Sequence, residues 1–110
     1  MNAFVVIDGG ICGFQTRVHA SSEDSQNVNF KIASACEKVR EAGTALVAKG
    51  TVDAYAELGA GSDGVILATA RETLRGCCAG CVVPSGIFKA MQVAAGVALP
   101  KDITLTITAE

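Results

Sequence analysis

The sequence predicts an α+β fold, in which a mainly antiparallel sheet of about four strands forms one layer and helices pack on one face of it. Three observations predict this class. The first third of the chain alternates apolar and polar residues, the middle has helical periodicity, and residues 102–108 alternate again. No linker is long enough to divide the chain, so we expect residues 1–110 to form a single domain.

The composition excludes several classes of protein. Half of the 110 residues are apolar and 18% are charged, which excludes intrinsic disorder. The chain has 18 alanines and no tryptophan, so the core must consist mainly of small and aliphatic side chains at close spacing. A net charge of −2 without a basic stripe argues against nucleic acid. Without a signal peptide or a membrane-length apolar run, we expect a cytoplasmic protein that does not bind membranes and keeps its thiols reduced.

The strands are expected at residues 4–8, 14–20, 28–33 and 102–108. In the second strand, the even-numbered residues from Phe14 to Ala20 share an apolar face, and Gln15, Arg17 and His19 share a polar one. A glycine-rich turn at residues 8–13 joins the first two strands. The last strand would place its isoleucines and leucine on one face and its threonines on the other, and it would return to the sheet across the helices.

Helices are expected to fill the middle of the chain. Ser34 and Glu37 form an S-x-x-E capping box, which predicts a helix start with Ser34 as the N-cap. Three further helices are expected at residues 52–58, from Ser62 or Asp63 to Arg75, and from Pro84 to Gly96.

The five cysteines are the best candidates for chemistry, because all lie at predicted turns or helix starts. Cys78 and Cys81 form a C-x-x-C, a spacing that presents two sulfurs to one centre. Cys12 lies in the glycine-rich turn and Cys36 in a first helical turn, where the helix dipole favours an anionic ligand. We therefore expect Cys12, Cys36, Cys78 and Cys81 to bind a metal, with Cys77 as a substitute for its neighbour. The single C-x-x-C favours an iron–sulfur cluster over zinc.

Other interpretations of these residues stay open. Free cysteines often act as small apolar core residues, and Cys78 with Cys81 could instead form a redox thiol pair. A thiol catalyst centred on Cys36 or Cys81 is a further option, although no base or substrate pocket can be named. The lone histidine, His19, is expected to be a solvated or interface side chain, and Asp8 is expected to stabilise a turn.

The residues at 12–14, 34–37, 81–90 and 98–102 resemble a small, uncharacterised family of cysteine-containing proteins from anaerobic prokaryotes, a domain of unknown function. The resemblance covers most of the chain. It implies a shared site around Cys12, Cys36 and Cys81, but no activity. An anaerobic setting would suit an oxygen-sensitive cluster.

Two functional hypotheses follow. The first is a small metal-binding protein that holds an iron–sulfur cluster, or zinc, and transfers electrons, carries the cluster or regulates an unknown protein partner. The second is a metal-free binding or assembly module whose cysteines are structural or redox thiols, and whose polar sheet face forms a homodimer.

Overall fold

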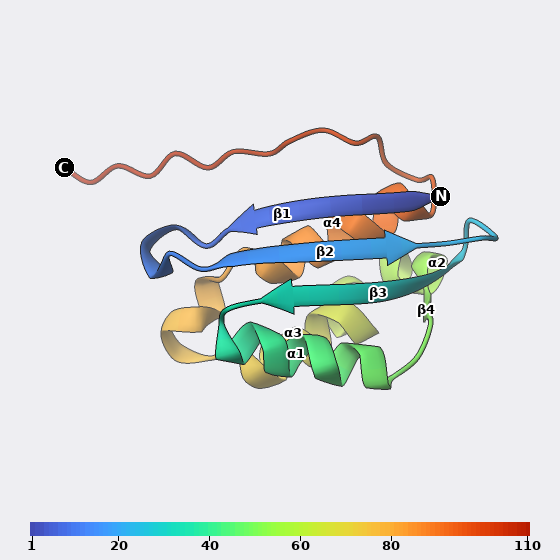
Figure 1. Cartoon of the computed structure of the whole chain (residues 1–110), viewed down its shortest axis with the longest axis horizontal. Helices are drawn as coiled ribbons and strands as arrows, with labels where there is room; N and C mark the ends of the chain where they lie inside the picture. The colour runs from blue at the N-terminus through green and yellow to red at the C-terminus, as the bar shows by residue number, and fades with distance from the viewer.

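The computed structural model describes residues 1–110 and confirms the α+β class (Figure 1). An antiparallel four-stranded sheet has the order β1-β2-β3-β4. The strands are β1 (Asn2–Asp8), β2 (Gln15–Ser21), β3 (Asn27–Ser34) and β4 (Val52–Asp53). The helices are α1 (Glu37–Ala48), α2 (Ala54–Ala60), α3 (Val65–Thr73) and α4 (Val83–Ala94), with 3₁₀ turns η1 (Gly10–Cys12), η2 (Gly61–Asp63) and η3 (Gly76–Gly80).

Strands β2 and β3 keep the faces that their alternation predicts. Thr16, Val18 and Ala20 of β2 are buried, whereas the intervening residues point to the open face of the sheet. On the helical side, α4 packs against β1 and β2, α1 packs against β3, and α3 contacts both of these helices. One face of the sheet is therefore covered and the other is open.

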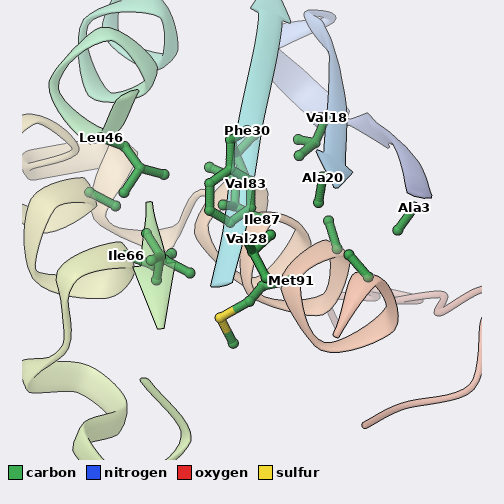
Figure 2. Close-up of a cluster of buried hydrophobic side chains, with 14 of the residues drawn as sticks. Ala3, Val18, Ala20, Val28, Phe30, Leu46, Ile66, Val83, Ile87 and Met91 are labelled. Atoms are coloured by element: carbon green, nitrogen blue, oxygen red, sulfur yellow. The ribbon is translucent and has the colours of Figure 1, made fainter. Parts of the chain in front are cut away.

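The core between the layers is built from small and aliphatic side chains, as the composition predicts (Figure 2). Close approach of the layers depends on glycine as well as alanine. A Cβ atom on Gly86 of α4 would lie only 2.3 Å from Cδ1 of Ile7 in β1. The buried residues labelled in Figure 2 are Ala3, Val18, Ala20, Val28, Phe30, Leu46, Ile66, Val83, Ile87 and Met91.

The capping box predicted for α1 is wrong. Ser34 is the last residue of β3 and pairs with Thr16, so the strand continues past the expected cap. The N-cap is Cys36, whose side chain makes no capping hydrogen bond. The Ser34 hydroxyl oxygen instead accepts hydrogen bonds from the Cys36 amide at 3.1 Å and from the Thr16 hydroxyl at 2.8 Å.

The starts of α2 and α3 also differ from the prediction. Val52 and Asp53 pair with β3 as β4, and the Asp53 carboxylate then caps α2. Neither Ser62 nor Asp63 caps α3. The carboxylate of Glu57, a side chain only 3% exposed, accepts from the amides of Val65 at 2.9 Å and Ile66 at 2.7 Å. This cap comes from the preceding helix, which a local sequence pattern does not specify.

The strand predicted at residues 102–108 is wrong, and the fourth strand of the sheet is β4 instead. The segment is extended and runs past the outer side of β1 (Figure 1), but it forms no backbone hydrogen bond with the sheet. Every residue from 99 to 110 is exposed. The alternation specifies two faces for a strand, but it does not supply an edge to pair with.

The sequence predicts no apolar run of membrane length, but one helical segment of the structure reaches that length. Residues Gly76–Ala94 are long and apolar enough to cross a membrane by length and composition. Within the fold, however, α4 places Ile87, Ala90 and Met91 in the core against the sheet. Its apolar character therefore has a sufficient explanation in the packing of the domain.

Candidate functional site

The segments that carry the five cysteines lie at the same end of the molecule. Cys12 closes η1 in the turn between β1 and β2, and Cys36 lies between β3 and α1. Cys77 and Cys78 lie in η3, and Cys81 follows it. Figure 1 shows these three segments together at the left end of the domain. We call this region the cysteine end.

The sheet register explains how distant cysteines reach one end. Ile7 pairs with Thr16, and Thr16 pairs with Ser34, so these three residues form one row across the sheet. The η1 turn and the β3–α1 junction both lie just beyond this row. Gly86 of α4 packs against Ile7, which brings the start of α4 and the preceding η3 turn to the same end.

The turn around Cys12 depends on glycine. Gly10 and Gly13 have φ angles of +78° and +74°, which L side chains rarely adopt. A Cβ atom on Gly9 would lie 2.5 Å from the Cys12 sulfur, so the glycine lets the chain fold closely around it. The Asp8 carboxylate accepts from the Gly10 amide at 2.9 Å, a hydrogen bond typical of a turn former.

The cysteine side chains differ in their surroundings. All five are free thiols; Cys12 and Cys77 are exposed, whereas the other three are half-buried and pack against the hydrophobic core. No three Cys, His, Asp or Glu side chains form a group that could hold a metal ion. The structure thus brings the cysteine-bearing segments to one end without arranging their sulfurs as a coordination shell. The assignment of Cys12, Cys36, Cys78 and Cys81 as ligands stays a prediction.

The open face of the sheet is a second candidate surface. The Phe4 ring stacks on His19 with centroids 4.5 Å apart and planes within 9° of parallel. His19 Nε2 also lies 3.1 Å from Asn2 Oδ1. Arg17 and Lys31 line the same shallow depression over β1 to β3. The face therefore combines aromatic and basic side chains, although no buried polar group marks a ligand site in it.

Sequence reasoning missed two features of the exterior. Phe4 and Val6, which are 73% and 61% exposed, are the large apolar side chains that the strands expose, and both lie on the edge strand β1. Pairing of β1 with one neighbour only could not be read from its sequence. The second feature is the free C-terminal segment, because its alternation indicated a strand inside the sheet.

No curated protein and no solved structure matches the chain. A family model matches residues 3–107, which include the cysteine end, almost all of the sheet and most of the C-terminal segment. The chain therefore belongs to a family of unknown function, DUF6951.

Proposed function

We propose that the cysteine end binds an iron–sulfur cluster, with zinc as the alternative, through Cys12, Cys36, Cys78 and Cys81. Cys77 is the substitute for Cys78. The observation that carries this proposal is the placement of three cysteine-bearing segments, distant in sequence, at one end of the domain (Figure 1). Four thiolates suit either a cluster or tetrahedral zinc.

The local backbone supports this proposal, since each proposed ligand lies in a turn or beside a helix start, outside the regular ladders. Metal binding requires the sulfurs to move together, and movement confined to η1 and η3 leaves the sheet unchanged. Cys12 is exposed, while Cys36, Cys78 and Cys81 are half-buried against the core. A centre with one exposed and three half-buried ligands would be shielded on its inner side and open to a partner on its outer side.

The partly exposed position of the proposed metal centre favours a role in which another protein binds next to it. Electron transfer, cluster delivery and redox-dependent regulation all require a centre near the surface. The resemblance to cysteine-containing proteins of anaerobic prokaryotes adds to the proposal, because such an environment preserves oxygen-sensitive clusters. We propose an electron-transfer, cluster-carrier or regulatory role with a protein partner.

The test is anaerobic purification and cluster reconstitution, followed by assays of iron, sulfide, zinc and visible absorbance. We expect one cluster or one zinc ion per chain, and its loss in C12S, C36S, C81S and the double variant C77S/C78S, in which neither the proposed ligand nor its substitute remains. C77S is the matched control, because Cys77 lies in the same turn as Cys78, and this variant should retain the metal. Protein that stays free of metal after reconstitution would contradict the proposal.

The competing function is a metal-free binding or assembly module. The packing of Cys36, Cys78 and Cys81 against the core favours it, because thiols in such positions act as small apolar side chains. The aromatic and basic residues of the open face would then provide a contact surface for another protein, including a second copy. In this case, cysteine substitutions should lower stability to a graded extent, equally with and without metal.

A further inference from the structure

The C-terminal segment has the sequence pattern of a strand but no partner strand in its own sheet. Residues 102–108 are extended and alternate in polarity, yet they form no backbone hydrogen bond. Their apolar side chains Ile103, Leu105 and Ile107 are 71%, 75% and 89% exposed. An exposed row of large aliphatic side chains on an extended chain is typical of a strand that adds to another sheet.

The same chain also has a free sheet edge, on β1. The Ser22 amide donates to the Met1 carbonyl at 3.0 Å, and the Gly9 amide donates to the Phe14 carbonyl at 2.9 Å. Since hydrogen-bonded pairs alternate along an antiparallel ladder, the odd-numbered residues of β1 bond to β2. The amides and carbonyls of Asn2, Phe4, Val6 and Asp8 therefore point outward. No proline, lysine or bulge blocks this edge.

We propose that two copies of this chain exchange their C-terminal segments, so that residues 102–108 of each copy pair with the free edge of β1 in the other. This inference is independent of the proposed metal centre. A donor strand and an acceptor edge in the same chain are self-complementary, and reciprocal exchange uses both in a closed two-fold dimer. Each sheet would gain a fifth strand.

The dimensions and the apolar residues of the two partners match. The predicted strand at 102–108 has seven residues, as does β1. Phe4 and Val6, the exposed large apolar residues of the sheet, lie on β1. A paired strand that directs Ile103, Leu105 and Ile107 to the open face would cover them with cross-strand neighbours.

The direction of the segment favours exchange over pairing within one chain. Figure 1 shows it running in the same direction as its own β1, so pairing within the chain would be parallel. A two-fold axis perpendicular to the sheet reverses the partner's β1. Pairing between copies would then be antiparallel, like every other pair in this sheet.

The experiment measures the mass in solution by sedimentation equilibrium over a range of concentrations. Each copy contributes seven residues of the C-terminal segment and seven of β1, fewer than the roughly 20–30 residues per side of a standard interface. We therefore expect a reversible dimer of the 11.2 kDa chain with a dissociation constant on the order of 1 μM. A chain that stays monomeric up to about 1 mM, roughly a thousandfold higher, would overturn the proposal.

Two variants test the acceptor and the donor separately. Val6→Pro removes an outward amide without removing a hydrogen bond to β2, and proline is tolerated at such edge positions. A chain shortened after Lys101 lacks the donor strand and loses no core residue. Both should remain folded by circular dichroism and become monomeric.

The matched control is Val47→Ser, which removes an apolar side chain that is 50% exposed on α1, and which should stay dimeric. Amide exchange adds a direct readout, because the Asn2, Phe4 and Val6 amides should gain protection in the wild-type dimer. A dimer that persists in either Val6→Pro or the shortened chain would overturn the proposal, since another surface, such as the open sheet face, would then hold it together.

Discussion

Strand β2 and the C-terminal segment 102–108 have the same sequence pattern but different structures. Both alternate apolar and polar residues over seven positions. Strand β2 lies between β1 and β3 and buries Thr16, Val18 and Ala20, whereas the C-terminal segment is exposed along its whole length. Alternation therefore specifies which side chains share a face. Whether that face is buried depends on a neighbouring edge and on a covering helix, which lie elsewhere in the chain.

The largest expected effect tests this contrast with one substitution at two sites. Leu46 is 2% exposed in the core, and Leu105 is 75% exposed on the C-terminal segment. Leu46→Ala should lower the free energy of unfolding by about 2–5 kcal/mol, because it removes buried area and leaves a cavity. Leu105→Ala should change it by less than about 0.5 kcal/mol in dilute protein.

Urea denaturation measures both values, and the dilution must be sufficient to keep the chain monomeric. A comparable loss of stability from the two substitutions would contradict the contrast, because it would mean that the C-terminal segment packs on its own domain.

The strands and the cysteine end were predictable to different extents. The faces of β2 and β3 follow from alternation alone, because the period of two determines which side chains share a surface. Sequence placed Cys12 and Cys36 at turns, but only the row formed by Ile7, Thr16 and Ser34 puts those turns at the same end. Register is a property of paired strands, so no single segment encodes it.

Helix starts were predicted less well, because the stabilising partners are not local. Ser34 could have capped α1, but its pairing with Thr16 keeps it in β3. The cap of α3 is the Glu57 carboxylate, eight and nine residues before the amides that it accepts from. Ser62 and Asp63 are the alternative caps that the local sequence predicts, because an N-cap usually lies next to the first residue of its helix. The actual cap depends on the position of α2 relative to α3, which brings the Glu57 carboxylate to the start of α3.

Substitution of glycine by alanine gives a second comparison between a packed and an unpacked region of the domain. A Cβ atom on Gly86 would lie 2.3 Å from Ile7 Cδ1 and 2.8 Å from its Cγ1, whereas one on Gly59 meets no atom within 4 Å. Gly86→Ala should cost about 1–3 kcal/mol through overpacking. Gly59→Ala, in the last turn of α2, should stabilise the domain by about 0.4–1 kcal/mol.

Thermal unfolding of the two glycine variants gives the sign of each change. Because Gly86 holds the start of α4 against β1, its substitution should also alter the alkylation rate of the neighbouring η3 thiols. If Gly86→Ala were as stable as Gly59→Ala, the close contact between α4 and Ile7 would not determine the position of the cysteine end.

The smallest expected effect concerns a loop whose structure is local, in contrast to the C-terminal segment. Between β2 and β3, the Asp24 carboxylate accepts hydrogen bonds from the Asn27 side chain at 2.8 Å and from the Asn27 and Gln26 amides at 2.8 and 3.0 Å. The side-chain hydrogen bond from Asn27, followed by the two amides, lowers the pKa of Asp24 from 3.8 to about 2. Because the folded pKa is the lower one, the carboxylate stabilises the fold above about pH 4, and this contribution disappears as the pH falls to about 2.

The melting temperature of Asp24→Ala should therefore lie below that of the wild type at pH 6 and approach it at pH 2, while the exposed neighbour variant Glu23→Ala serves as the control. A difference between Asp24→Ala and the wild type that does not change with pH would show that these hydrogen bonds do not depend on the charge of Asp24, and that the loop keeps its shape through its backbone alone.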